Sequence, residues 1–343
     1  MIKNLRNVAI PGTGLPLSII AKSKILTFFF VAFVNPLVCL IGAIAHAPSF
    51  QVAAERFEEQ LLRPRDWFSL WRLNCRLATH HAGISGHGDY SFEDKLKFLN
   101  KADSEGIPVT PRLDVPWIVC KHRNEEGGLG FVDFVNANDG GDWIIQPRIT
   151  NDDFISSMLP SDCPLSTFRV ISASKAWLKA HGSESPKMDD ISALSCVWRA
   201  GREGASTDHS CIMFNVDPET GIIQKGTTSK HWYKLGPAAI FTTPWTSTHD
   251  VTEHPDTGKT ITGTKIERME EMMTLVRNAH LKIMPHVPLC GWDVAFTREH
   301  GILLLEVNIS CNFFRGTFDH DHYFQFVSDY FQKLEAHGPK VVL

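Results

Sequence analysis

One stretch near the C-terminal end restricts the fold of this 343-residue chain more than any other. It reads GWDVAFTREHGILLLEVN and occupies residues 291–308. Apolar residues dominate positions 292–297 and 302–308, whereas positions 298–301 are polar or glycine. This pattern predicts two short strands joined by a turn, and therefore an antiparallel β-hairpin.

Three oxygen-bearing side chains converge at the end of this hairpin. A turn centred between Glu299 and His300 places Asp293 directly opposite Glu306 in the ladder. Asn308 lies two residues beyond Glu306 and therefore points to the same face. Two carboxylates and a carboxamide are the hard ligands that Mg²⁺ prefers. Polar side chains on the solvent face of an ordinary hairpin are the alternative, although a Glu that ends so apolar a strand is costly without a partner.

Residues 25–47 form an apolar segment with no charged side chain before His46. A helix of about 20 apolar residues crosses the ~30 Å bilayer core, so the length permits one span. Pro36, near the middle, breaks or kinks a helix. Three interpretations remain open: a kinked single span, a re-entrant hairpin, and a cleaved signal with residues 45–47 as its small-residue site. A buried core helix fits less well, because such helices seldom lack a polar face over this length.

Basic residues flank the apolar segment on both sides. Lys22 and Lys24 precede it, residues 1–24 contain no acidic residue, and several arginines follow it. The charges therefore indicate no orientation in a membrane. Residues 52–80 then show helical periodicity, and Pro64 is expected to divide them into two helices.

The charge distribution and the cysteine spacing argue against a nucleic-acid partner and a structural zinc site. The formal charge is −4 with basic and acidic residues mixed along the chain, so no basic face predicts a nucleic-acid partner. The eight cysteines are scattered without CxxC spacing, which indicates reduced thiols and argues against a structural zinc site.

Periodicity predicts further elements. Ser91 is the expected N-cap of a helix that ends at about residue 101, with Asp94 at its third position. Strands are expected at 117–121, 131–135, 142–149, 164–174 and 195–201, and helices at 266–283 and 323–336.

A glycine-rich turn separates the first two of these strands. Gly127, Gly128 and Gly130 let backbone N–H groups approach phosphates closely, and Lys121 supplies a positive charge. No GK[ST] follows, so this is not a Walker loop, and no helix follows, so it is not a Rossmann fingerprint. A flexible hairpin tip also explains the glycines.

Two arginines lie in the middle of apolar strands. Arg169 and Arg199 each need an anionic partner if buried, and a guanidinium grips phosphate oxygens in a bidentate way. Salt bridges to acidic side chains are the alternative. The loop at 248–258 contains His and Asp residues that suggest a metal site, but an ordinary Pro-Asp-Thr-Gly turn explains it equally.

GWDVAFT…GILLLEVN, together with HPDTG at residues 254–258, resembles the sugar-transfer-associated branch of the ATP-grasp superfamily. The resemblance covers roughly residues 91–318. It implies an α+β fold in which two subdomains clamp ATP, with a small subdomain at 91–149 and a large one at 150–343. A basic and hydrophobic membrane or targeting segment at 1–50 and a helical region at 51–90 would precede them.

The resemblance also implies a site for ATP and Mg²⁺. The implied magnesium ligands are Asp293, Glu306 and Asn308. The implied nucleotide contacts are Lys121, Gly127, Gly128 and Gly130 at the phosphates, and Gln146, Pro147, Arg148 and Ile149 at adenine. The implied catalytic residues are Arg169, Arg199 and Arg315. His209 stands where this branch tends to have Asn, so an imidazole replaces the side chain that would contact phosphate or metal there.

The activity implied is that of a ligase, which activates a small carboxylate as an acyl-phosphate and joins it to an amine or another nucleophile. The association of this ATP-grasp branch with sugar-transfer genes suggests a role in glycan or cell-surface metabolism. A kinase of a small hydroxyl substrate and a non-catalytic, membrane-attached nucleotide-binding protein are the alternatives. If the protein uses ATP, its catalytic part must face the cytosol or an organelle interior. The protein is then either attached to the membrane or soluble after cleavage of the N-terminal segment.

Overall fold

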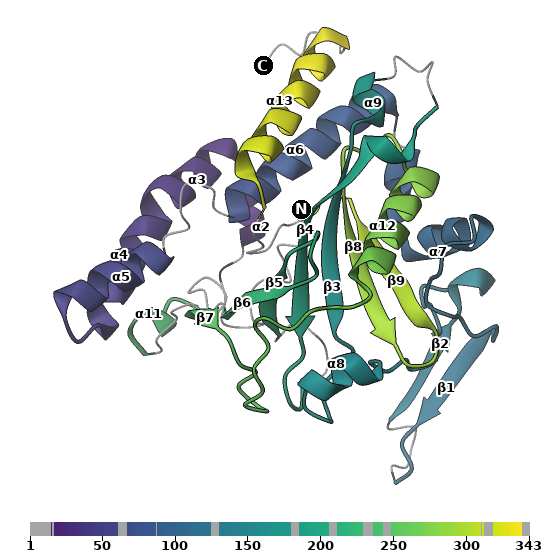
Figure 1. Ribbon diagram of the computed structural model, residues 1–343, viewed down its shortest axis with the longest axis horizontal. Coiled ribbons are helices and arrows are strands. Elements are labelled where there is room, and N and C mark those ends of the chain that lie inside the picture. Colours follow the sequence, from purple (N-terminus) through teal and green to yellow (C-terminus); the bar gives the residue numbers. More distant parts are fainter. Residues whose placement is uncertain are drawn as a thin grey trace.

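The computed structural model describes residues 15, 17–60, 67–86, 88–124, 130–179, 185–205, 211–228, 236–242, 248–309, 311 and 318–337. A seven-stranded sheet forms the centre of the molecule, with helices on both faces, and a separate two-stranded sheet projects beside one edge (Figure 1). All strand pairs within these sheets are antiparallel. The structure therefore confirms the α+β class.

The large sheet has the strand order β7-β6-β5-β4-β3-β8-β9. Every residue of β3 and β8 is buried, as expected for central strands that have neighbours on both sides and cover on both faces. Its strands are β3 (Thr167–Ser174), β4 (Ile191–Ala200), β5 (Ile212–Val216), β6 (Ile223–Thr228), β7 (Thr248–Val251), β8 (Leu289–Thr297) and β9 (Gly301–Asn308).

Helix α12, Met269–Ile283, covers one face of this sheet. Its methionines lie in the main core with Phe168 and Trp292, as the apolar stripe predicts. Within this core, the Trp292 indole N–H donates to Ser172 Oγ at 2.8 Å. The Ser172 oxygen in turn lies 2.7 Å from Nδ1 of His280 in α12.

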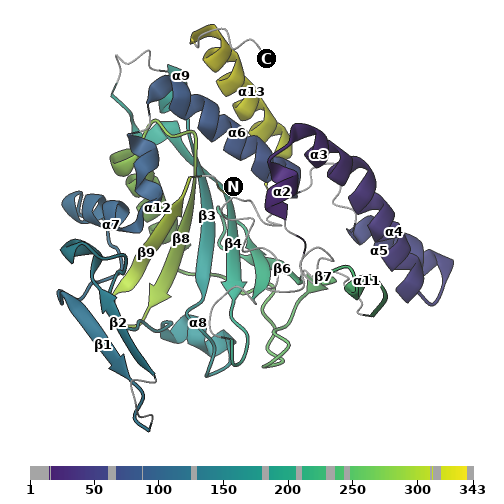
Figure 2. The ribbon, with the colours of Figure 1, turned by 180° about the vertical axis from the view of Figure 1, so that it is seen from behind.

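Two helices cross one end of the opposite face, α6 (Trp67–Ser85) and α13 (His320–His337) (Figure 2). Tyr323 and Tyr330 of α13 form a second core with Ile171 and Leu289 of the sheet. Helix α5 (Phe50–Gln60) precedes α6 in the chain, and Pro64, the predicted point of division between them, lies outside the described residues. The rest of this sheet face borders the cavity described below.

The β8–β9 hairpin has the predicted pairing of Asp293 with Glu306. The turn, however, is shorter than predicted, because Thr297 pairs with Gly301, which has a φ of 72°. One extra residue in β9, Leu305, lies between the pairs Val294–Leu304 and Asp293–Glu306. This β-bulge shifts the register by one residue and restores the predicted pairing.

The small sheet consists of β1 (Trp117–Lys121) and β2 (Phe131–Val135), in the predicted positions. The strand expected at 142–149 was wrong: the segment forms only an isolated bridge at Trp143 and otherwise runs outside both sheets. The N-cap expected at Ser91 was also wrong. Asp94 caps α7 (Lys95–Ser104), because residues 89–93 already form a 3₁₀ turn before it.

The apolar segment forms one continuous helical rod from Lys24 to His46, made of α3 (Lys24–Phe29), a π-helical turn (Phe30–Val34) and α4 (Asn35–His46). The π turn ends two residues before Pro36, where a proline removes a backbone hydrogen bond. The rod is long and apolar enough to cross a membrane, and 28% of its most apolar window is buried against the protein.

The other helices are short: α2 (Leu17–Ala21), η2 (Asp89–Glu93), η3 (Ala137–Asp139), α8 (Asp153–Met158), α9 (Ala176–Lys179), η4 (Met188–Asp190) and α11 (Ala239–Thr242). All eight cysteines are free.

Candidate active site

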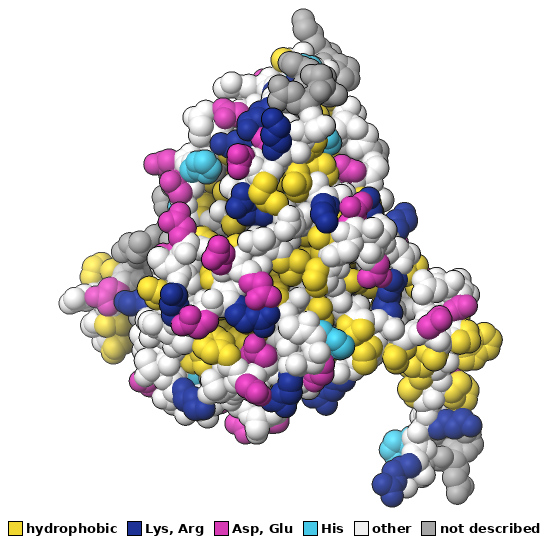
Figure 3. All heavy atoms as spheres, turned by 45° about the vertical axis from the view of Figure 1, so that its right-hand side comes forward, with side chains coloured by type: hydrophobic (Ala, Val, Ile, Leu, Met, Phe, Trp, Pro, Cys, Tyr) yellow, Lys and Arg dark blue, Asp and Glu magenta, His cyan; other side chains and the backbone are white. Residues whose placement is uncertain are grey.

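A cavity of about 850 Å³ lies between the large sheet, helix α7 and the segment that follows the small hairpin. Arg199, Asp293 and Glu306 line it from the sheet, Lys95 from α7, and Gln146 and Ile149 from the segment. The small hairpin projects from the body beside it, with apolar side chains gathered at its base (Figure 3). Its size suits a small-molecule ligand.

Asp293 holds two arginines at the wall of this cavity. Arg199 donates from Nη2 to Asp293 Oδ2 at 2.7 Å, and Arg169 donates from Nε to Oδ1. All three side chains are buried. The strand order explains the arrangement, because Arg169 pairs with Asp293 across β3 and β8, and Arg199 comes from the next strand, β4.

The electrostatics of this cluster keep Asp293 ionised. Burial by itself raises the pKa of a carboxyl, but the charges and hydrogen bonds of Arg169 and Arg199 outweigh it and lower the pKa of Asp293 to about 2. Arg199 therefore presents a guanidinium beside Asp293 at the cavity wall, and a guanidinium is the side chain that best binds an anionic ligand such as a phosphate.

Glu306 and Asn308 form a second polar group beside this cluster. Asn308 Nδ2 donates to Glu306 Oε1 at 3.2 Å, and Lys95 Nζ lies 2.9 Å from Glu306 Oε2. The Glu306 side chain is 28% exposed, so water and ligands can reach it from the cavity. A hydrogen-bonded carboxylate and carboxamide are hard oxygen donors, which fits Mg²⁺.

The three implied magnesium ligands thus have different surroundings. Both oxygens of Asp293 are engaged by guanidinium groups, which compete with a metal ion, whereas Glu306 faces a single lysine from an exposed helix end. In this arrangement Glu306 and Asn308 are placed to bind a metal ion, whereas Asp293 positions two arginines. Among the described residues, no group of three or more His, Cys, Asp or Glu side chains is arranged to hold a metal.

The implied adenine contacts divide into two groups. Gln146 and Ile149 line the cavity, and Gln146 Nε2 donates to Thr110 Oγ1 at its wall. Pro147 and Arg148 are not among the residues that line it, and Arg148 is exposed.

The implied phosphate contacts lie on the projecting hairpin. Lys121 ends β1, and its ammonium sits 5.9 Å from the centre of the Phe131 ring, outside the cavity. Gly130 has a φ of 67°, and its carbonyl accepts from the His122 N–H. Gly127, Gly128, His209 and Arg315 lie outside the described residues.

Lys95 is a cavity residue that the sequence analysis missed. It occupies the first position of α7, where the helix dipole favours an acidic residue. A lysine at that position was the available signal, since it indicates a nearby anion that compensates for the unfavourable end of the dipole.

The HPDTG loop has a structural explanation in this fold. Asp256 accepts from Arg202 Nε and Nη2 at 2.7 and 2.6 Å, and His254 Nε2 lies 2.9 Å from the Gly201 carbonyl. The Arg202 hydrogen bond is the main cause that lowers the Asp256 pKa to about 2. The loop therefore fastens the end of β4 to the segment after β7.

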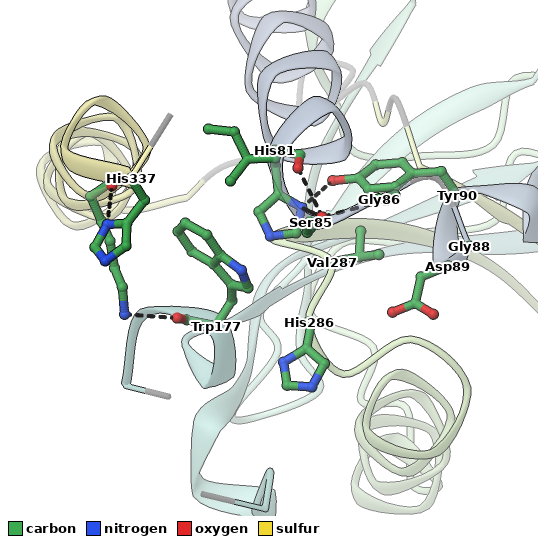
Figure 4. A pocket seen from close by; sticks show the side chains of 12 residues that line it. His81, Ser85, Gly86, Gly88, Asp89, Tyr90, Trp177, His286, Val287 and His337 are labelled. Atoms are coloured by element: carbon green, nitrogen blue, oxygen red, sulfur yellow. Dashed lines mark hydrogen bonds between the residues drawn. The ribbon is translucent and has the colours of Figure 1, made fainter. Parts of the chain in front are cut away.

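A second cavity of about 540 Å³ lies where α6 ends, beside α9 and α13 (Figure 4). His81 and Trp177 border it, and the Tyr90 hydroxyl lies 2.8 Å from His81 Nδ1. Burial lowers the pKa of His81 to about 4, so this imidazole is neutral at pH 7. Among the described residues, none of those implied for ATP or metal lines this cavity.

Comparison with known proteins gives one family match. The family model described as sugar-transfer associated ATP-grasp matches residues 134–314, more than half of the chain. No curated protein matches the sequence.

Two solved structures are similar over 72% of the chain. N5-carboxyaminoimidazole ribonucleotide synthetase from Thermotoga maritima has 11% identity, a TM-score of 0.30 and 50% of its own length covered. N5-carboxyaminoimidazole synthetase from Staphylococcus aureus, complexed with ADP, has 9% identity, a TM-score of 0.30 and 52% covered. The chain thus spans about half the length of either protein.

Proposed function

The chain belongs to the sugar-transfer associated ATP-grasp family, and from this premise we propose that it is an ATP-dependent ligase. It activates a small carboxylate as an acyl-phosphate, with release of ADP, and an amine or another nucleophile then displaces phosphate. The family description supports a substrate in glycan or cell-surface metabolism.

The observation that carries this proposal is that Arg199, Asp293 and Glu306 line one cavity, with Arg169 bound to Asp293 behind its wall. Phosphoryl transfer needs groups that neutralise the charge on the equatorial oxygens, and two preorganised guanidiniums supply them. Asp293 fixes their orientation. Glu306 and Asn308 would hold Mg²⁺, which when bound neutralises phosphate charge.

Both subdomains of the fold would contact the nucleotide. The small subdomain, residues 91–149, would cover the phosphates with Lys121, Gly127, Gly128 and Gly130 and hold adenine at residues 146–149. The large subdomain, residues 150–343, would supply the metal ligands and the arginines, including Arg315. Cavity residues from both sides support this division.

Nucleotide binding tests the site directly. We expect the full-length protein in detergent to bind Mg-ATP by calorimetry, and Glu306→Ala to lose the magnesium-dependent part. Glu270→Ala is the matched control, because Glu270 is an exposed carboxylate on α12 that does not line the cavity. A folded wild-type protein that does not bind Mg-ATP would overturn the proposal.

The reaction type can be identified by measuring ADP release in the presence of panels of candidate substrates. A requirement for both a carboxylate and an amine supports the ligase. Release with a polyhydroxyl compound alone would identify a kinase instead. Tight nucleotide binding without release by any panel would indicate a non-catalytic nucleotide-binding protein.

Residues 25–47 are proposed to attach the protein to a membrane, with the catalytic part facing the cytosol or an organelle interior. The exposed apolar side chains of the helical rod support this attachment. Co-sedimentation of the full-length protein with lipid vesicles tests it. Cleavage after Ala47 would instead leave a shorter chain, which the mass of the purified natural protein would reveal.

A further inference from the structure

We infer that the helical rod Lys24–His46 lies along the surface of a bilayer, within one leaflet, and does not cross it. The inference rests on the proposed membrane attachment and specifies its geometry. The occupant of the exposed face is a lipid surface that contains anionic headgroups.

One face of the rod is apolar and open. It carries a row of large side chains that remain exposed in the folded protein, far more than a surface in water normally collects in one place. They are Ile25, Leu26, Phe28, Phe29, Phe33, Val34, Leu37, Leu40, Ile41 and Ile44.

The opposite face of the rod is packed on the protein. Phe30 and Cys39 are buried in one cluster with Trp71 of α6, together with Leu17 and Ala21 of α2. Phe30 is 6% exposed, whereas Phe33, three residues further along the same rod, is 56% exposed. The rod is therefore apolar on both faces, and the folded protein covers only one of them, which leaves the other face to contact lipid.

Both ends of the rod are fastened to the globular part. At the first end, Arg72 of α6 donates to the Thr27 hydroxyl. At the second end, His46 Nε2 lies 2.8 Å from the Ile240 carbonyl of α11, and Arg56 of α5 donates to the His46 carbonyl. The rod thus lies against α5 at one side of the molecule, as Figures 1 and 2 show.

These attachments are incompatible with a span. The rod has 23 residues and is about 35 Å long at ~1.5 Å per residue, enough to cross the hydrocarbon. If it crossed while docked, α5 and part of α6 would enter the hydrocarbon with it. Charged side chains such as Glu55 and Arg72 would then lie at membrane depth, which is costly.

The charges at the edge of the rod fit an anionic surface. Lys22 and Lys24 are exposed at its start, and the first acidic residue of the chain is Glu55. Basic residues beside an apolar face strengthen binding to anionic headgroups. The projecting hairpin of the candidate active site lies at the opposite end of the molecule, away from the lipid surface (Figure 1).

Photo-crosslinking at two neighbouring phenylalanines tests the geometry. Benzoylphenylalanine is placed at Phe30 or at Phe33 of the full-length protein, which is bound to vesicles of phosphatidylcholine and phosphatidylserine. We expect Phe33 to crosslink to lipid and Phe30 to crosslink within the protein. Lipid adducts of similar yield at both positions would show that the rod leaves the protein to enter the bilayer, and would overturn the inference.

Protease protection separates a span from the surface arrangement independently. With protein added outside sealed vesicles, an N-terminal tag should be digested as fast as the C-terminal end. A tag protected until detergent is added would show a span. If the wild-type protein does not bind vesicles at all, the membrane attachment itself is wrong, and the inference falls with it.

Two sets of variants test the surface. Phe33→Asp should reduce vesicle binding at least tenfold, whereas Trp117→Asp, at an exposed aromatic residue on the projecting hairpin, should leave it unchanged. Lys22→Gln and Lys24→Gln should each weaken binding to the anionic vesicles about fivefold. Equal losses for Phe33→Asp and Trp117→Asp would contradict a lipid contact specific to the rod.

Discussion

Lys95 of α7 and Glu306 of β9 form an ion pair, with 2.9 Å between Nζ and Oε2, inside the candidate active site. A metal ion at Glu306 must share or displace this lysine. Helix α7 therefore places a cation of its own where the proposed function requires magnesium.

This competition predicts the effect of Lys95→Met. Removing the ammonium frees Glu306 Oε2, so the Mg²⁺ concentration for half-maximal ATP binding should fall. The Lys95 side chain is 63% exposed, and solvent screening limits the change to about two- to fivefold. Magnesium titrations at fixed ATP measure it. Lys97→Met, on the exposed side of the same helix, is the control, and a raised magnesium requirement in Lys95→Met would contradict the competition.

Asp293→Asn should destabilise the folded protein strongly. The change removes the negative charge between Arg169 and Arg199 and leaves two buried guanidiniums to repel each other. Breaking a buried ion pair in this way costs about 3–5 kcal/mol of unfolding free energy. Urea unfolding measures the loss. Glu299→Gln, at an exposed carboxylate of the same hairpin, should lower the unfolding free energy far less, because solvent screens an exposed charge. A loss that small in Asp293→Asn would show that the cluster does not stabilise the fold.

Stability should fall as the pH falls from about 6.5 to 4. His280 is buried, and its Nε2–H donates to the Val287 carbonyl, so Nδ1 accepts from Ser172 and has no room for a second proton. Burial lowers the pKa of His280 to about 4, and that of His81 to about 4 as well.

The direction of this pH dependence follows from the number of protons that the folded and unfolded chains bind. Between these pH values the unfolded chain binds protons at both histidines and the folded chain does not, so acid favours unfolding. Each histidine contributes a slope of up to ~1.4 kcal/mol per pH unit, and its contribution is complete above about pH 6.5. Urea unfolding between pH 7 and 5 measures the slope, which His280→Gln should reduce. If the substitution leaves the slope unchanged, His280 does not contribute to the pH dependence of the unfolding free energy.

Gly291→Ala should destabilise the hairpin. An added Cβ would lie 2.8 Å from the Cβ of Cys311, so one of the two segments must move. Overpacking of this kind costs about 1–3 kcal/mol. Gly83→Ala is the control, because a Cβ at this position of α6 meets nothing within 4 Å and should stabilise the helix by up to ~1 kcal/mol. Thermal unfolding compares them, and equal midpoints would contradict the predicted clash.

The β8–β9 hairpin could be predicted because its local pattern is strong. Two apolar runs around a short polar turn allow few pairings, and Asp293 with Glu306 is one of them. The family itself followed from motifs of the same kind, and the match over residues 134–314 confirms it.

Long-range features could not be read from the sequence. Arg169 and Arg199 were expected to need an anion, but that Asp293 supplies it depends on the strand order β4-β3-β8. The strand expected at 142–149 failed for a related reason: its composition suits a strand, yet its backbone makes only isolated hydrogen bonds to residues 113 and 135–137 and no continuous ladder. Lys95 was missed because its partner lies more than 200 residues away.

The extra residue in β9 determines which side chain faces Asp293. Continued unchanged from the turn, the pairing of Thr297 with Gly301 would bring Leu305 opposite Asp293. Deletion of Leu305 would therefore leave the hairpin with one uniform ladder and would draw Glu306 one position closer to the turn, still opposite Asp293. A one-residue insertion at the turn would lengthen the loop and leave Asp293 opposite Glu306. A one-residue insertion within β9, in contrast, would have to be absorbed by a second bulge or by loss of the carboxylate pair. Length changes in the turn and in the strand are thus not equivalent, and the strand is under the stricter constraint.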